Sequence, residues 1–140
     1  MMDIQTIINA MADTLEAATG KTIYEDEVKQ GFSDHCFYIN PLKATYTPVV
    51  GRWWQGSYTF DVIYYTTSKT EGYQYGEKLR DLLEVLDTED GTIRGVNMSY
   101  QYIGSDAVHL YVTYNVSLRK PPDSLVKMTK LTTEEGLKNG

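Results

Sequence analysis

The chain has 140 residues, enough for one compact domain and too few for two ordinary ones. Its 41% hydrophobic and 23% charged residues exclude a disordered or fibrous polypeptide. The 19 acidic residues outnumber the 13 basic ones, and the resulting net charge of -6 argues against nucleic acid as a general ligand. The single cysteine excludes an internal disulfide or a thiolate metal site.

The N-terminal segment predicts an amphipathic helix that ends near Gly20, because glycine readily takes the left-handed conformation of a helix end. Its apolar stripe consists of Ile4, Ile7, Ile8, Met11 and Leu15. No basic region precedes these residues, and no apolar run in the chain is long enough to cross a bilayer. We therefore expect neither a secretion signal nor a membrane span. The single cysteine fits a reducing, cytoplasmic origin.

Two strands are predicted between residues 21 and 42. The first is short and centres on Ile23 and Tyr24, and it is followed by loop residues. The second begins near Cys36 as a continuous apolar run, until Pro41 removes a backbone donor and moves the strand to a sheet edge. We interpret the acidic run at residues 25–27 as a solvated loop, because it lacks the spacing and oxygen ligands of a calcium site.

The triplet at residues 34–36, Asp-His-Cys, invites comparison with an activated nucleophile. Adjacent residues of a strand project to opposite faces, so the thiol and the imidazole are poorly placed to form a pair. The sequence therefore favours a small buried cysteine beside a loop histidine.

A long excursion over residues 43–57 contains Arg52 followed by the chain's only tryptophans, Trp53 and Trp54. Two neighbouring strand residues point in opposite directions, so we expect at least one indole to face something other than the domain's own core. Interfaces favour Trp, Tyr and Arg, which makes these three residues candidates for a protein contact. The alternative is that both indoles fill the ends of the domain's own core.

The strand after this excursion places Tyr58, Phe60, Val62 and Tyr64 on one face. Asp61 lies on the other face, where burial of a carboxylate is costly unless a cation or several donors meet it. The alternatives are that it faces water or that it has a basic partner, for which the candidates are Arg52, Lys43 and Arg94.

A second helix is predicted within residues 68–91, from apolar residues at three- and four-residue spacing: Tyr75, Leu79, Leu82, Leu83 and Leu86. Two long strands follow over residues 92–103 and 107–119, joined by a short hairpin connection. In the last strand we interpret His109 as a polar group on the sheet surface.

These elements predict an α+β fold: a mainly antiparallel sheet with two helices packed on one face, a long loop or hairpin excursion, and a C-terminal tail. We expect one domain over residues 1–120 and a tail over residues 121–140, since Pro121 and Pro122 end the last strand. The tail's apolar residues are candidates for contact with a neighbouring protein, the alternative being packing on their own domain: Leu125, Val126, Met128 and Leu131.

The sequence contains no P-loop, no GxGxxG and no HExxH motif, and it has only two histidines. We therefore predict no catalytic residues, no cofactor and no metal site, and a protein that is not an enzyme.

Several of these segments together resemble the tail terminator, or tail completion, proteins of phages and prophages of Gram-positive bacteria. The resemblance covers almost the whole chain up to Arg119, and its most specific parts are Arg52 before a strand, Phe60-Asp61-Val62 with Tyr64-Tyr65, and Arg94-Gly95 with Asn97-Met98. These are patterns of a structural protein rather than of a catalytic site.

The resemblance implies a virion protein of the neck-proximal end of the tail, assembled in the cytoplasm of the bacterial host. Such a protein forms a ring, usually a hexamer, that caps the tail tube and joins it to a neck or connector protein. The DNA passes through the lumen without specific binding, and no membrane is involved. Arg52, Trp53 and Trp54 would then be candidates for a subunit or tail-tube contact. The alternative functions are a neck adaptor or another tail-assembly module such as a chaperone.

Overall fold

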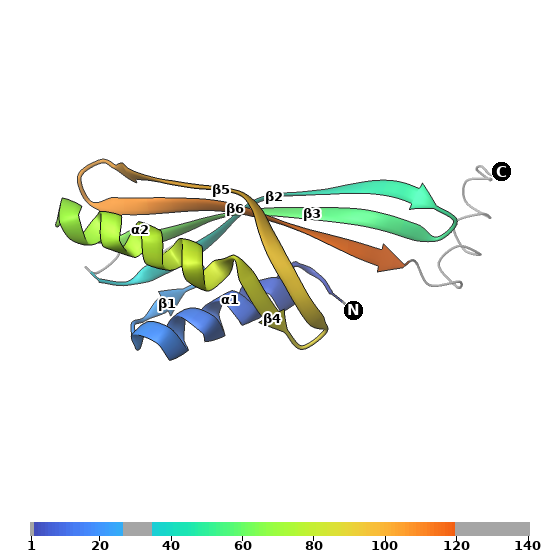
Figure 1. Cartoon of the computed structure of the whole chain (residues 1–140), viewed down its shortest axis with the longest axis horizontal. Helices are drawn as coiled ribbons and strands as arrows, with labels where there is room; N and C mark the ends of the chain where they lie inside the picture. Colours follow the sequence, from blue (N-terminus) through green and yellow to red (C-terminus); the bar gives the residue numbers. More distant parts are fainter. Residues whose placement is uncertain (1, 27–34, 120–140) are drawn as a thin grey trace. The chain divides into compact units, whose positions relative to one another are not determined.

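The computed structural model describes residues 2–26 and 35–119, and within them the chain is α+β, with two helices and a six-stranded mixed sheet (Figure 1). The strand order in the sheet is β1-β2-β3-β6-β5-β4. In chain order the elements are α1 (Ile4–Thr19), β1 (Ile23–Tyr24), β2 (Phe37–Val50), β3 (Trp53–Tyr65), α2 (Lys69–Leu83), β4 (Val85–Thr88), β5 (Gly91–Ile103) and β6 (Ala107–Arg119).

The described residues fall into two parts, which we describe separately. The body comprises those of Met1–Thr45 and Ser57–Val116, and the hairpin tip comprises Tyr46–Gly56 with residues 117–119. Both helices belong to the body. The expected domain boundary at residue 120 coincides with the end of the described residues and stays a prediction.

Helix α1 has the capped ends that its sequence indicates. The Asp3 carboxylate accepts a hydrogen bond from the Thr6 backbone N–H at 2.9 Å, which satisfies one donor of the first turn. Gly20 ends the helix in the left-handed conformation, with φ 68°, and its N–H donates to the Glu16 carbonyl at 2.8 Å. The predicted helix and its stop are confirmed. No helix among the described residues is long and apolar enough to cross a membrane.

Helix α2 begins after the N-cap Ser68 and ends at Leu83. The prediction that Leu86 belongs to this helix is wrong, because Leu86 lies in β4 and is paired with Ile93 of β5. The Glu84 carbonyl accepts from the Gly95 N–H at 2.7 Å, so the backbone enters the sheet within two residues of the helix end. Leu86 is nevertheless fully buried. It is an apolar core residue three positions after Leu83, so in the sequence it continued the spacing of the helical stripe.

The core of the body is built from alternating residues of β3 and β6, as the period-two pattern predicts. Side chains on one face of β3 are almost completely buried: Tyr58, Phe60, Val62 and Tyr64. Facing residues of β6 are buried too, and the ring of Tyr114 meets that of Phe60 edge-on at a centroid distance of 6.2 Å. The Tyr114 hydroxyl donates to the Leu83 carbonyl and thereby ties the end of α2 to β6.

The sheet contains one parallel pair, between β1 and β2, with Ile23 opposite Phe37. The pairs β4–β5 and β5–β6 are antiparallel. The expectation of a mainly antiparallel sheet is compatible with this arrangement but did not include the parallel pair. Because β1 reaches only Tyr38, no described strand pairs with β2 on that side from Ile39 onward, and Pro41 lies in this edge segment as predicted.

The excursion over residues 43–57 is a continuation of two strands. Strand β2 runs to Val50 and β3 begins at Trp53, so that a two-residue turn of Gly51 and Arg52 joins them. Gly51 has φ 58°, at the first central position of the turn, where tight hairpins often require glycine. The excursion is therefore a β-hairpin.

Gly95 and Asn97 of β5, two residues of the pattern Arg94-Gly95 with Asn97-Met98, affect the backbone of this strand. A Cβ on Gly95 would lie 2.7 Å from a methyl group of Val112, so a larger residue would force the Val112 side chain to shift. Asn97 has φ 54° at a shift in the β5–β6 register, where asparagine is tolerated better than most residues. Both residues serve the close packing and the irregularity of β5.

Candidate assembly surface and buried polar clusters

The hairpin tip places the three sequence-predicted interface residues side by side along the chain. Arg52 is half-buried in the turn, Trp53 is 45% exposed, and Trp54 is half-buried. The guanidinium of Arg119 lies 5.7 Å from the centroid of the Trp53 ring, within the range of a cation–π contact. This geometry leaves the Trp53 indole accessible at a basic site.

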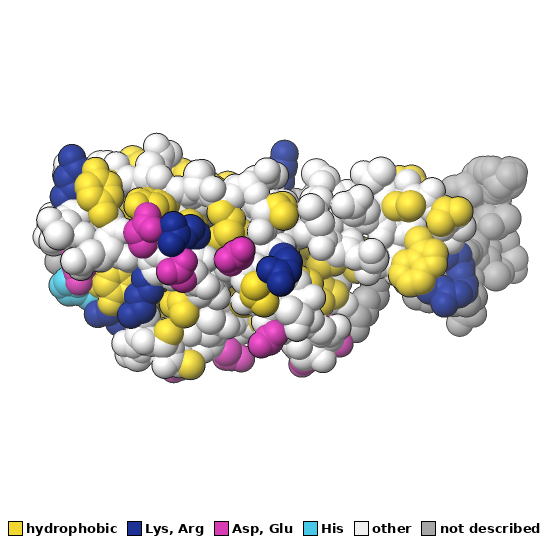
Figure 2. Space-filling model, in the orientation of Figure 1, with side chains coloured by type: hydrophobic (Ala, Val, Ile, Leu, Met, Phe, Trp, Pro, Cys, Tyr) yellow, Lys and Arg dark blue, Asp and Glu magenta, His cyan; other side chains and the backbone are white. Residues whose placement is uncertain are grey.

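The same tip exposes further large apolar side chains, which sequence reasoning did not single out. Val49 and Val50 are 63% and 69% exposed, and Tyr46 is about half exposed. Figure 2 shows hydrophobic side chains gathered at this hairpin beside basic ones. Gly56 permits close packing inside the tip, because a Cβ there would lie 3.0 Å from Leu118. An exposed cluster of this kind in a tight hairpin is typical of a surface that becomes buried on association.

The other sequence-predicted contact residues are Leu125, Val126, Met128 and Leu131. They lie outside the described residues, so their contacts stay a prediction.

Asp61 of β3 is buried, with 7% of its surface exposed, and its partner is His109 of β6. The Nδ1 atom of His109 lies 2.9 and 3.0 Å from the two carboxylate oxygens. The predicted alternatives for Asp61, water or a partner among Arg52, Lys43 and Arg94, are therefore wrong. His109 is a partly buried hydrogen-bonding residue rather than a surface group, and the pair ties two neighbouring strands together.

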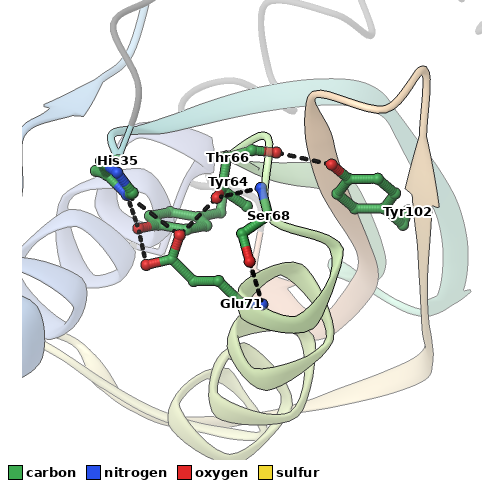
Figure 3. Close-up of polar contacts among 6 residues, drawn as sticks. All are labelled: His35, Tyr64, Thr66, Ser68, Glu71 and Tyr102. Carbon is green, nitrogen blue, oxygen red and sulfur yellow. Dashed lines mark hydrogen bonds and ion pairs between the residues drawn. The ribbon is translucent and has the colours of Figure 1, made fainter.

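A second polar cluster surrounds the start of α2 (Figure 3). The Glu71 carboxylate accepts a hydrogen bond from the Thr66 hydroxyl at 2.5 Å and from the Tyr64 hydroxyl at 3.3 Å. His35 Nδ1 lies 3.0 Å from the Tyr64 hydroxyl and 3.3 Å from a Glu71 oxygen. The Ser68 side chain caps α2 by accepting a hydrogen bond from the Glu71 N–H at 3.2 Å. The Glu71 carboxylate in turn joins the first turn of α2 to Tyr64 of β3.

Tyr64 also stacks on Tyr75 of α2, with ring centroids 3.9 Å apart and planes inclined by 13°. The ammonium of Lys21 lies 5.9 Å from the centroid of each ring. Burial, followed by the nearby Tyr75 and Glu71, raises the pKa of the Tyr64 hydroxyl well above its ordinary value. Tyr64 is therefore a neutral hydrogen-bonding group at physiological pH.

The thiol and the imidazole of the Asp-His-Cys triplet lie in different surroundings. Cys36 is 2% exposed, as the sequence predicts, and the neighbouring imidazole of His35 contacts Tyr64 and Glu71. His35 has φ 63°, an uncommon conformation that orients its ring toward α2. Among the described residues, no group of three or more His, Cys, Asp or Glu side chains is placed to hold a metal ion. Both clusters connect secondary-structure elements.

Residues 6–125 match the family model described as "Phage tail terminator protein". The chain belongs to this family. The tail terminator chain is accordingly a structural protein of the phage tail. No curated protein matches it.

The fold is also found in a solved structure entitled "Virion of native gene transfer agent (GTA) particle". A chain of that particle is 12% identical to the tail terminator chain, with a TM-score of 0.54. The match covers 83% of the tail terminator chain and 96% of the other. At this identity the likeness establishes the shared fold.

Sequence reasoning missed the partner of Asp61 because β3 and β6 are neighbours in the sheet but distant in the chain. The sequence contained part of the information needed to find this pair, since a carboxylate and an imidazole each interrupt an apolar strand. Pairing them required knowledge that β6 inserts between β3 and β5.

Proposed function

We propose that this protein forms a ring, with six subunits as the expected number, that caps the head-proximal end of a phage tail tube. The ring stops growth of the tube and joins it to a neck or connector protein. Membership of the phage tail terminator family is the observation that carries this proposal. The exposed Trp53, Val49 and Val50 support it, because a subunit that assembles needs apolar surface beyond its own core.

In this proposal Arg52, Trp53 and Trp54 lie at a subunit or tail-tube contact, and the apolar residues after Pro122 lie at a contact with a neighbouring protein. The net charge of -6 suits a ring through which DNA slides without specific binding, since carboxylates facing the lumen repel phosphates. Assembly takes place in the cytoplasm of the host cell.

The test is to add the purified protein to polymerising tail-tube protein and to examine the products by electron microscopy. We expect rings in the sample of the terminator alone, and tubes that carry a ring at one end and grow no further. The same tube protein without the terminator provides the control. A protein that forms no rings and leaves tube growth unchanged would contradict the proposal.

A further inference from the structure

The hairpin tip differs in charge from the chain as a whole. Its described residues include Arg52 and Arg119 and no carboxylate side chain, whereas the complete chain has a net charge of -6. Among the described residues neither arginine forms a salt bridge. Two guanidinium groups that form no salt bridge within the described part of the chain lie with exposed Trp53 and Val50 in the tip, and this basic and partly apolar surface favours an acidic partner.

The body contains a surface of complementary charge. Helix α1 and strand β4 flank a depression of about 130 Å³ whose lining includes three exposed carboxylates, Asp13, Asp87 and Glu89, among uncharged side chains. Asp87 accepts a hydrogen bond from the Thr92 hydroxyl at 2.8 Å. Within the described part of the chain, Asp13 and Glu89 have neither a hydrogen bond nor an ion pair from a side chain.

Figure 2 shows acidic side chains over the region that α1 and β4 occupy in Figure 1. A head-to-tail contact joins two different patches and places one of each on every subunit. The basic, apolar hairpin and the acidic depression are two such patches on the same chain. The charges of the two patches favour the pairing of tip with depression and disfavour contacts between like patches.

We propose that the hairpin tip of one subunit docks into the acidic depression of the next, with Arg52 facing Asp13, Asp87 and Glu89 of the neighbouring copy. The exposed valines and Trp53 lose contact with water in the same step. This inference rests on the proposed ring and adds to it the identity of the two surfaces that meet. The occupant of the depression is thus a second copy of this chain.

A charge exchange tests the contact, with self-association of the full chain measured by analytical ultracentrifugation. Arg52→Glu alone should weaken association by about tenfold or more, since it opposes like charges at the contact. Asp13→Lys with Glu89→Lys should do the same. All three substitutions in one chain recreate an attractive pair and should restore association to near the wild-type value. Lys69→Glu, the same charge change on the exposed part of α2, serves as the matched control and should have no effect.

Thermal unfolding of each variant establishes that it is folded before association is compared. Normal association of Arg52→Glu would overturn the inference, and so would failure of the combined variant to recover, because the tip would then bind another surface such as the tail tube. In both cases wild-type rings would remain and the proposed function would stand. A wild-type chain that forms no ring would refute the ring itself together with this contact.

Discussion

The body and the hairpin tip use the same residue types in opposite ways. In the body, aromatic side chains such as Tyr58, Tyr64 and Tyr114 are almost completely buried, and two of them direct their hydroxyl groups to internal acceptors. In the tip, Trp53 and Tyr46 are about half exposed. Aromatic residues therefore stabilise the fold of the body, whereas those of the tip remain available for association.

This contrast separates folding from assembly. A side chain that is already buried contributes to the free energy of unfolding of the monomer, whereas an exposed one contributes only after a partner covers it. The following predictions test this separation, beginning with the largest expected effect.

Phe60→Ala removes a fully buried ring from the core of the body. We expect it to lower the free energy of unfolding by about 3–5 kcal/mol, because it loses apolar burial and leaves a cavity. Urea denaturation followed by circular dichroism measures this change. Val49→Ala in the tip, where the side chain is largely exposed, should change stability by less than about 0.5 kcal/mol. Similar losses in the two variants would refute the separation.

Trp53→Ala and Trp54→Ala should weaken assembly more than folding. At the proposed contact we expect a loss of about 2 kcal/mol in association, roughly a thirtyfold rise in the dissociation constant, since buried tryptophans dominate interface energies. Ultracentrifugation measures association and thermal unfolding measures stability.

Tyr73→Ala provides the matched control for Trp53, because Tyr73 lies on α2 in the body and is also 45% exposed. It should leave association unchanged. If both tryptophan variants unfold early but associate normally once folded, the indoles serve the core and not the contact.

His109→Leu removes the partner of the buried Asp61. We expect a loss of about 1–3 kcal/mol in stability, because a buried carboxylate is left without its hydrogen bond. Adding Asp61→Val should recover part of this loss, since both polar groups are then absent. Urea denaturation of the two single variants and the double variant gives the coupling energy. Strictly additive losses would show that the two residues act independently.

These two residues also indicate how far the sequence determines the structure. Period-two and helical patterns predicted both helices, the long strands β5 and β6 and the buried face of β3, because these features depend on local spacing. The pairing of Asp61 with His109 depends on which strands become neighbours, and local spacing carries no such information. β4 was missed because its only fully buried residue, Leu86, continued the spacing of the preceding helix.

The candidate contact surface was predictable in part. Composition alone identified Arg52 and the two tryptophans, because interfaces favour those residue types. The exposure of Val49 and Val50 was not predictable, since valines in a strand are more often buried. Their exposure follows from the extension of β2 and β3 as far as a two-residue turn. This extension was not predicted, because the proline and glycines of the segment indicate a loop.

The smallest predicted effect concerns alkaline pH and is confined to the body. Burial raises the pKa of Tyr114 above its ordinary value near 10, and burial with the nearby Cys36 and Asp106 raises the pKa of Tyr65 to about 12. In the unfolded chain both hydroxyls ionise near pH 10. Above pH 10 the folded chain thus binds more protons than the unfolded chain, so stability is fully present below pH 10 and falls as pH rises.

For the deeply buried Tyr114 this decline amounts to at most about 1.4 kcal/mol per pH unit. Urea denaturation of the wild type between pH 8 and about pH 11 should show it. Tyr114→Phe should be about 1 kcal/mol less stable at neutral pH, because the hydrogen bond to the Leu83 carbonyl is lost, but its decline above pH 10 should be shallower. Equal declines in both proteins would show that other groups control the alkaline transition and that the buried tyrosine of the body is not a source of this pH dependence.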